Sequence, residues 1–296
     1  MREDRLAALA ETRMRRPEAV AEAAAARRRP ASPVPDRGRL LVLTADHPAR
    51  AALAVGGRAY AMADRADLLD RLVTALARPG VDGLLGTPDV VEDLLLLGAL
   101  HGKVVLGSMN RGGLAGSAFE VDDRFTAYDA AGIDASGLQG GKMLLRIDPD
   151  DPATARTLEQ AARAVDALSA RRLVAMVEPF WAQRVAGRLR NDLSPDAMVR
   201  AVSVASGLGT TSAYTWLKVP VVADMERVVG ATTLPALILG GEVSTDQDST
   251  FAAWERAVRL PTVTGLVVGR SLLYPPDDDV AAAVDTAAAL LAPKGG

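Results

Sequence analysis

Residues 141–178 read GKMLLRIDPDDPATARTLEQAARAVDALSARRLVAMVE. An apolar run over 143–147 precedes an amphipathic stretch over 152–170, and a second apolar run covers 173–177. These patterns predict a strand, a helix and a second strand. Pro152, directly after Asp151, is typical of the first turn of a helix. A strand–helix–strand unit predicts two parallel strands of one sheet, joined by a helix that covers it.

The same alternation continues along most of the chain. Further strands are predicted over 40–45, 83–85, 104–106, 214–217, 234–239 and 265–268. Further helices are predicted near 65–77, 88–100, 122–131, 194–206, 223–230, 246–258 and 278–291. Eight strand–helix units in roughly 250 residues predict an α/β fold of the TIM (β/α)8 barrel type. A doubly wound open sheet is the alternative, but residues 43–48, LTADHP, lack the Gly-rich turn expected after its first strand.

The N-terminal segment differs in composition from the rest. Residues 2–29 are mostly Ala, Glu and Arg and read as a helix, which a Pro-rich stretch over 30–35 ends. We therefore expect an N-terminal helical extension over 1–36 and a barrel domain over 37–296. The first 29 residues hold no apolar core segment of a secretory signal. We accordingly expect a cytoplasmic protein.

Charge and hydropathy exclude several classes of partner. The net charge is −3 and the pI is near 5.6, so nothing indicates binding to nucleic acid. No apolar run reaches the roughly 18 residues that span a membrane. The partner we expect is therefore neither nucleic acid nor a membrane, and a homo-oligomer is compatible with the sequence.

The scarcity of sulfur and imidazole ligands restricts the chemistry further. The chain has no cysteine and only two histidines, His47 and His101, so a three-His zinc site is impossible. We expect neither a metal nor a cofactor, and chemistry carried by Lys, Asp, Glu, Tyr or Ser side chains. His101 precedes a strand and is expected to be structural, whereas His47 could transfer a proton or hydrogen-bond at the barrel mouth.

Lysine is rare in this sequence. Of 34 basic residues only four are lysines, at positions 103, 142, 218 and 294. Lys218 closes the apolar run over 213–218 and Lys142 opens the run over 142–147. A buried ammonium can lose its proton and act as a nucleophile, whereas a guanidinium stays charged. The alternative is that both lysines only form buried ion pairs.

Ionisable residues fall at strand ends, where TIM barrels carry their chemistry. Asp46 follows the first strand, Glu178 the fifth and Lys218 the sixth, while Lys142 opens the fourth. Because isolated buried charges are costly, we expect the two lysines to pair with the two carboxylates. A neutral Lys218 could then attack a carbonyl to form an iminium, with Lys142 favouring the neutral amine. Glu178 or Asp46 would move the protons.

Glycine-containing loops follow the last two predicted strands. Gly240 and Gly241 come after the seventh strand, and Gly269 and Arg270 come after the eighth. This is the usual phosphate site of a TIM barrel, because glycine lets backbone N–H groups approach an anion and arginine binds it bidentately. Arg111, after the third strand, is a further candidate contact to substrate, although its neighbouring glycines equally suit a plain mobile loop.

Taken in order, these motifs resemble the class I, Schiff-base aldolases of the deoxyribose-phosphate and tagatose-bisphosphate type. The motifs are Leu43-Thr-Ala-Asp46, Asp82-Gly83, Gly141-Lys142-Met-Leu-Leu, Met176-Val-Glu178-Pro179, Leu217-Lys218-Val-Pro220, Gly240-Gly241 and Gly269-Arg270. The resemblance implies that Lys218 forms the imine, Lys142 assists it, Glu178 shuttles protons and Asp46 contacts a substrate hydroxyl. The first 35 residues and the segment 134–141 have no matching counterpart.

The resemblance is strongest to an aldolase-like branch associated with inositol catabolism. It implies cleavage of 2-deoxy-5-keto-gluconate 6-phosphate to dihydroxyacetone phosphate and malonate semialdehyde. Deoxyribose-phosphate, tagatose-bisphosphate and sulfosugar-phosphate aldolases are the alternatives among enzymes of this kind. An isomerase that uses Glu178 as its base, and a non-catalytic barrel that senses phosphosugars, also remain open.

Overall fold

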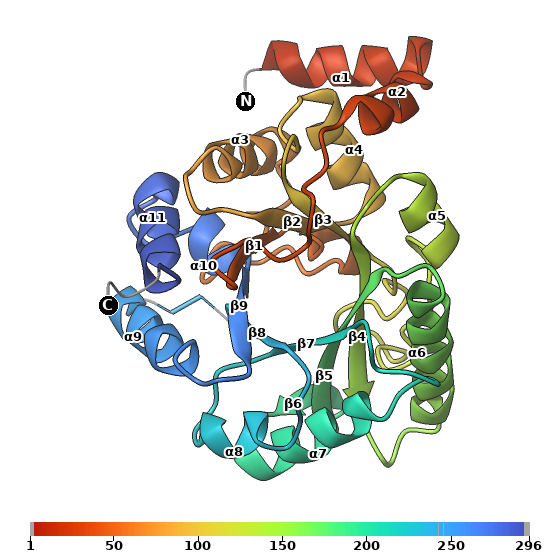
Figure 1. The fold of residues 1–296 in the computed structure, drawn as a ribbon, viewed down its shortest axis with the longest axis vertical. Helices are drawn as coiled ribbons and strands as arrows, with labels where there is room; N and C mark the ends of the chain where they lie inside the picture. The colour runs from red at the N-terminus through yellow and green to blue at the C-terminus, as the bar shows by residue number, and fades with distance from the viewer. Residues whose placement is uncertain (1–2, 242, 245, 293–296) are drawn as a thin grey trace.

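A computed structural model of the chain describes residues 3–241, 243–244 and 246–292. Eight parallel strands form a closed barrel, because β1 pairs with both β2 and β9 and β4 pairs with β5. Figure 1 shows these strands enclosed by a ring of helices. The predicted TIM barrel is confirmed. The barrel strands are β1 Leu40–Thr44, β2 Gly83–Gly86, β3 Val104–Ser108, β4 Gly140–Ile147, β5 Val174–Val185, β7 Thr215–Val219, β8 Ala236–Leu239 and β9 Val263–Val268.

Helices follow the strands as the sequence predicts, with one displacement. They are α3 Arg65–Leu76, α4 Pro88–Leu96, α5 Ala130–Ala135, α6 Ala153–Ser169, α7 Pro195–Ser206, α8 Met225–Val229, α9 Gln247–Ala257, α10 Arg270–Leu273 and α11 Val280–Leu290, with a 3-10 turn η1 over Pro48–Arg50. The helix predicted near 122–131 is wrong: α5 begins only after Asp129, whose side chain accepts a hydrogen bond from the Gly132 N–H. Residues 109–128 form a long loop instead.

The barrel divides the apolar residues into an inner and an outer core. Alternate residues of a strand point inward, so Leu40 and Val42 of β1 pack inside the barrel while Leu41 and Leu43 pack against helices. The inner cluster also contains Leu85, Val104, Leu106, Val174, Met176, Leu237 and Val267. These side chains fill the barrel interior below the site, as in other TIM barrels.

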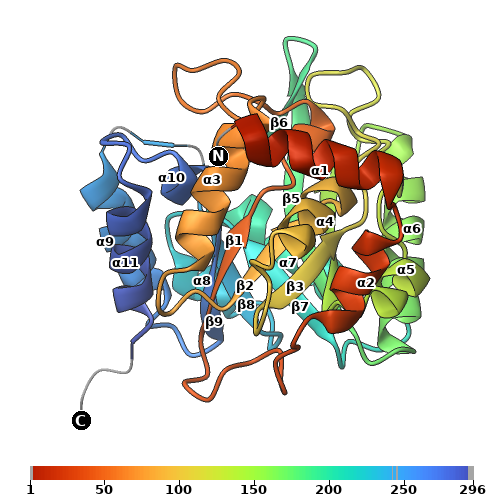
Figure 2. The same cartoon turned by 90° about the horizontal axis from the view of Figure 1, so that it is seen from above.

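Strand β5 is longer than predicted and continues beyond the barrel. Its outer part pairs antiparallel with β6, Arg188–Asp192, through a turn in which Ala186 and Gly187 both have positive φ, at 50° and 76°. Such a turn matches the twist of a hairpin. Figure 2 shows this hairpin projecting past the other strands. The sequence analysis missed it because Pro179 favours the end of a strand.

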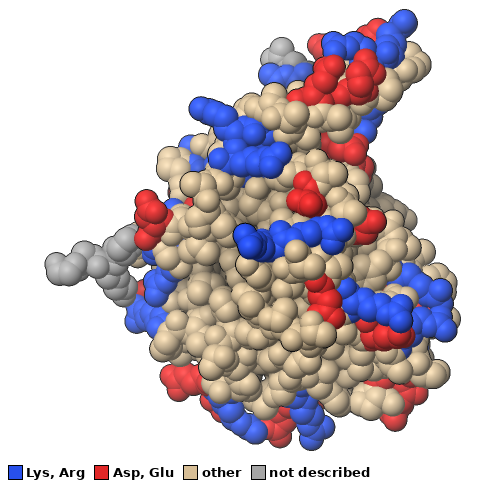
Figure 3. Space-filling view, turned by 45° about the vertical axis from the view of Figure 1, so that its right-hand side comes forward, with Lys and Arg blue, Asp and Glu red and all other residues tan. Residues whose placement is uncertain are grey.

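The N-terminal extension consists of two helices rather than one. α1, Glu3–Arg15, ends before Pro17, and α2, Ala19–Ala26, begins after it. A proline in a helix interior removes a hydrogen bond and clashes with the preceding turn, so the break falls there. Figure 1 shows the two helices on the outside of the barrel, and Figure 3 shows side chains of both charges at that end of the molecule.

Arg27 ties this extension to the amino-terminal ends of β3 and β4. Its guanidinium donates to the carbonyl oxygens of Lys103 at 2.8 Å and of Gly137 at 2.6 Å, and the residue is only 4% exposed. Both carbonyls lie just before a strand. The contact therefore holds the C-terminal end of the extension at the amino-terminal ends of these strands, while Arg13 of α1 contacts Glu92 and Asp93 of α4.

Replacing Arg27 should loosen this attachment. Arg27→Met keeps much of the apolar stem but removes charge-assisted hydrogen bonds to buried carbonyls. We expect the free energy of unfolding to fall by about 2–3 kcal/mol in urea denaturation. The neighbouring Arg28 is exposed, so Arg28→Met should change it little. Equal effects of the two substitutions would contradict the proposed role of Arg27.

Candidate active site

Four ionisable side chains meet inside the carboxyl-terminal end of the barrel. Lys142 of β4 forms a short ion pair with Glu178 of β5 and lies 3.3 Å, Nζ to Oδ2, from Asp46. The Nζ of Lys218, on β7, lies 2.9 Å from the other carboxylate oxygen of Glu178. Each of the four residues is at most 8% exposed. The structure thus brings together the residues that the sequence singled out, and it pairs both lysines with one glutamate.

Strand register explains why these side chains meet. On β4, residues two apart share a face, so Lys142, Leu144 and Arg146 all point into the barrel and line its cavity. Val177 of β5 pairs with Leu217 of β7, which places Glu178 and Lys218 side by side one residue later. Regular strands therefore fix the positions of the charged groups.

Asp46 is held by hydrogen bonds as well as by charge. The hydroxyls of Thr44 and Ser108 each donate to its carboxylate at 3.0 Å. The Nη2 of Arg111 lies 3.1 Å from Oδ2 of the same carboxylate. Burial alone would raise the pKa of Asp46, but Arg111 and Lys142 hold that pKa well below its usual range. Asp46 is therefore a fixed anion at the floor of the site, and Arg111 lies there too.

The lysine–glutamate group has unusual protonation properties. Burial lowers the pKa of Lys142 to about 8, against the attraction of Asp46 and Glu178. Burial also opposes ionisation of Glu178, yet the charges of Lys142 and Lys218 lower its pKa to about 2. A lysine that releases its proton near neutral pH, beside a carboxylate that stays ionised, is a common feature of amine-based catalysis.

A cavity of about 880 Å³ opens above these residues. Its wall includes Gly240, Gly241, Gly269 and Arg270, the residues of the predicted phosphate loops. Gly241 has a left-handed φ of 69°, which favours glycine. At Gly269 a Cβ atom would lie 2.3 Å from the carbonyl oxygen of Thr44, so only glycine fits against β1. Arg270 begins α10, a short helix that the sequence analysis did not predict.

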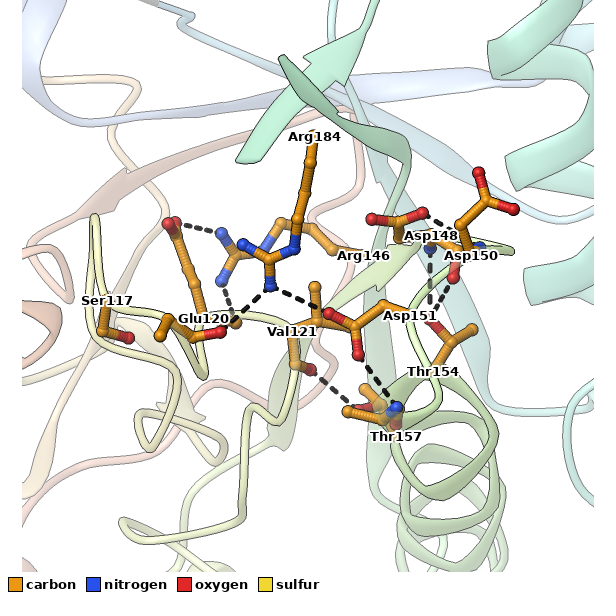
Figure 4. A network of polar contacts seen from close by, with 12 residues as sticks. Ser117, Glu120, Val121, Arg146, Asp148, Asp150, Asp151, Thr154, Thr157 and Arg184 are labelled. Carbon is orange, nitrogen blue, oxygen red and sulfur yellow. Dashed lines mark hydrogen bonds and ion pairs between the residues drawn. The ribbon is translucent and has the colours of Figure 1, made fainter. Parts of the chain in front are cut away.

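The cavity also contains residues that the sequence analysis missed. Arg50 of η1 and Arg146 of β4 both contact Glu120, which lies in the long loop after β3. Figure 4 shows Arg146 reaching the carboxylate of Glu120, and its Nη2 also donates to the Glu120 carbonyl oxygen at 2.8 Å. Arg146 could have been found, because it stands four residues after Lys142 on the same face of a strand.

The two histidines lie in different parts of the molecule and make different contacts. His47 lines the cavity, with its Nδ1 3.9 Å from Asp46, and burial lowers its pKa to about 3. It is therefore a neutral imidazole at the site. His101 accepts a hydrogen bond from the Arg28 backbone N–H at 3.1 Å, which is a structural contact with the N-terminal extension.

Among the described residues no group of three His, Cys, Asp or Glu side chains is arranged to hold a metal. None of the helices in the described part of the chain is long and apolar enough to cross a membrane.

A family model described as Cgl0159-like matches residues 38–288. The chain belongs to the Cgl0159-like family. The crystal structure of Cgl0159 from Corynebacterium glutamicum (Brevibacterium flavum) is 51% identical to it, covers 98% of each chain and superposes with a TM-score of 0.95. No curated protein matches the chain.

More distant structures share the fold of this Cgl0159-like chain. An archaeal fructose 1,6-bisphosphate aldolase is 17% identical, with a TM-score of 0.64 over 92% of this chain and 98% of the other. Another structure of an archaeal fructose-1,6-bisphosphate aldolase, with the catalytic Lys covalently bound to the carbinolamine intermediate of the substrate, is also 17% identical. Its TM-score is 0.63 over 92% of this chain and 99% of the other. At this identity the likeness establishes the fold alone.

Removing the negative charge of Glu178 should destabilise the folded chain in a pH-dependent way. Glu178→Gln leaves two buried ammonium groups without their shared anion. We therefore expect the free energy of unfolding of the variant to be about 3–5 kcal/mol lower than that of the parent at pH 6, and we call this difference the deficit. Above pH 6 Glu178 of the parent is ionised in both the folded and the unfolded state, so it does not make the free energy of unfolding depend on pH. The pKa of Lys142 should fall further below 8 in the variant, whose folded state then binds fewer protons than that of the parent. The deficit should therefore narrow as pH rises from 6 to 9.

Urea denaturation at several pH values measures this deficit. The control is Glu159→Gln on α6, where the side chain is 59% exposed and pairs with Arg163; it should change stability little at every pH. A deficit for Glu178→Gln that stays constant or widens toward pH 9 would contradict the assigned charge states.

Proposed function

We propose that this chain is a Schiff-base-forming, metal-independent aldolase that cleaves a phosphorylated keto sugar or keto acid through Lys218. The observation that carries the proposal is the Lys142–Glu178–Lys218 group at the floor of a cavity whose far wall carries glycine loops and Arg270. A buried amine next to an ionised carboxylate supplies both a nucleophile and a proton acceptor. The shared barrel fold is in keeping with this chemistry.

Position favours Lys218 over Lys142 as the nucleophile. Lys218 lies on β7, which pairs directly with β8, the strand that leads into Gly240 and Gly241. A ketone one carbon away from a phosphate held by these glycines would therefore lie nearer Lys218 than Lys142. Lys142 contacts two carboxylates, Asp46 and Glu178. This arrangement suits a group that orients substrate oxygens.

The proposed reaction balances without an added reagent. Neutral Lys218 attacks the ketone carbon, and the resulting carbinolamine loses water to give an iminium. Glu178 accepts the proton of the hydroxyl two carbons away, the carbon–carbon bond breaks, and its electron pair neutralises the iminium as an enamine. The aldehyde leaves. Protonation of the enamine carbon and hydrolysis of the new iminium then release the ketone phosphate and restore the lysine.

We propose 2-deoxy-5-keto-gluconate 6-phosphate as the substrate, with dihydroxyacetone phosphate and malonate semialdehyde as products, in inositol catabolism. The phosphate would lie against Gly240, Gly241 and Gly269, and Arg270 would bind its oxygens. Asp46 would contact a substrate hydroxyl. Deoxyribose-phosphate, tagatose-bisphosphate and sulfosugar-phosphate cleavage are the rival activities, and a phosphosugar sensor would bind such ligands without forming an imine.

Covalent trapping tests the role of Lys218. Borohydride added with dihydroxyacetone phosphate, and with EDTA present throughout, should reduce an iminium to a stable amine on the peptide that contains Lys218. Lys218→Arg keeps the charge but cannot supply a neutral amine, so the adduct should disappear and cleavage should fall by at least about a thousandfold. Peptide mass spectrometry locates the adduct.

Lys142→Arg is the matched control, since it keeps a cation beside Lys218 and should retain some adduct. Melting temperatures of both variants show whether the barrel is intact. An adduct on Lys142, or none on the parent chain, would overturn the proposal in favour of a different nucleophile or of a sensor.

Substitution of Arg270 tests the phosphate position. Arg270→Gln removes a charge-assisted contact and should raise KM for the phosphorylated substrate about 10- to 100-fold with a smaller effect on kcat. Arg256, which is exposed on α9, gives the control variant Arg256→Gln with unchanged KM. If Arg270→Gln also keeps the parent KM, the phosphate binds elsewhere.

A further inference from the structure

Three arginines gather at one side of the cavity, and we name them the arginine cluster: Arg50, Arg111 and Arg146. All three line the cavity. Arg111 is 6% and Arg146 is 5% exposed, so both guanidiniums are largely withdrawn from bulk water. Burial lowers the pKa of Arg50 to about 10, and the charges of Arg146 and Arg111 contribute to that change. Three cations held this close, two of them buried, repel one another.

Two members of the cluster, Arg111 and Arg146, lie across the barrel from the phosphate loops, and Arg50, which follows β1, reaches the loop after β3 through Gly113 and Glu120. Around the ring the strands follow the order β1, β2, β3, β4, β5, β7, β8, β9. Gly240 and Arg270 follow β8 and β9, whereas Arg111 follows β3 and Arg146 is on β4. In an eight-stranded ring these two strand pairs are diametrically opposed. Lys142, Glu178 and Lys218 lie at the floor between them, so one extended molecule could contact both ends and the lysines.

Charge at the cluster end is not fully balanced by the described residues. Asp46 and Glu178 match the two lysines in number. Glu120 and Asp123 face the three arginines, of which Arg111 also pairs with Asp46, so five cations meet four carboxylates and one positive charge is left over. Among the described residues, the Nε groups of Arg111 and Arg146 are also buried without a hydrogen-bond partner. Buried donors without partners are uncommon in folded proteins and indicate a missing acceptor.

We infer that the arginine cluster binds a carboxylate at the end of the substrate remote from its phosphate. A carboxylate carries the single negative charge that the cluster lacks, and its planar pair of oxygens matches a guanidinium fork. The inference rests on the proposed function and makes it more specific. The substrate is an acyclic acid phosphate, and the aldehyde released by cleavage is itself an acid.

A purely structural role for these arginines makes a different prediction. Arg50 and Arg146 hold Glu120 and thereby the loop after β3. Arg184 of β5 fastens the same loop, because its Nη2 donates to the Ala118 carbonyl oxygen at 3.0 Å and pairs with Asp151 at 2.8 Å. Figure 4 shows Arg146 and Arg184 side by side at this loop. Since Arg184 does not line the cavity, it separates loop attachment from ligand binding.

Two acyclic probes test the inference on the full chain by isothermal titration calorimetry. The probes are 6-phosphogluconate and glucitol 6-phosphate, which differ only in a carboxylate or a hydroxymethyl group at the end remote from the phosphate. The parent should bind 6-phosphogluconate at least about tenfold more tightly, as expected for a charge-assisted hydrogen-bonded pair. This ratio of affinities does not depend on the fraction of active protein.

Variants then assign the preference to the cluster. Arg146→Gln should reduce the ratio toward one, and Arg50→Lys, which keeps the charge but loses the fork, should reduce it in part. The second variant keeps the test open if the first does not fold. Arg184→Gln should leave the ratio at the parent value.

Three results would overturn the inference: equal affinities of the two probes for the parent, an equal loss of the ratio in Arg184→Gln, or tighter binding of glucitol 1,6-bisphosphate than of 6-phosphogluconate. The last would mean a second phosphate site. Neither probe has a carbonyl, so its binding does not depend on imine formation. A failed borohydride trap would therefore contradict the proposed Schiff-base reaction, whereas a failed probe comparison would contradict only the inferred binding of a carboxylate by the arginine cluster.

Discussion

The rest of the site depends on the carboxylate of Glu178, which holds two buried ammonium groups at once. Withdrawing such charges from water is costly, and a protein bears that cost only where the partners are fixed in position. Three neighbouring barrel strands supply Lys142, Glu178 and Lys218, and their hydrogen-bonded register allows little adjustment. A barrel closed around this group cannot slip by one residue without turning a charge toward the helices.

The strands and the loops have different roles in the site. Strands position the reactive groups, while loops at two opposite sides of the mouth present glycines and arginines to the ends of a ligand. In the proposed reaction, binding energy from both ends of the substrate would hold the reacting carbon against Lys218, which is how enzymes gain rate from parts of a substrate that do not react. The cationic ends of the cavity and the charge-balanced floor between them suit the proposed substrate, which is acidic at both termini.

The barrel and its charged floor could be predicted because both arise from periodic patterns. Apolar runs of strand length alternate with amphipathic helices, and Lys142 and Lys218 interrupt those runs. Features that depend on tertiary contacts were missed. Pro179 favours the end of a strand, but pairing with β6 prolongs β5 beyond it. The N-cap at Asp129 makes α5 begin later than the composition of the segment indicates. The ion pair of Arg146 with Glu120 joins residues from separate segments of the chain. Of these features, only the position of Arg146 on the same strand face as Lys142 could have been recognised in the sequence.

The hairpin of β5 and β6 has a consequence for how this barrel can diversify. Its inner residues Leu189, Arg190 and Asn191 form part of the cavity wall, yet β6 is the edge strand of the sheet and lies outside the ring that closes the barrel. Its length and composition can therefore change without breaking a hydrogen bond of the ring. Chain insertions there would alter the cavity wall while leaving the paired strands of the barrel untouched. The hairpin is thus a place where ligand selectivity could change around an unchanged Lys142–Glu178–Lys218 group.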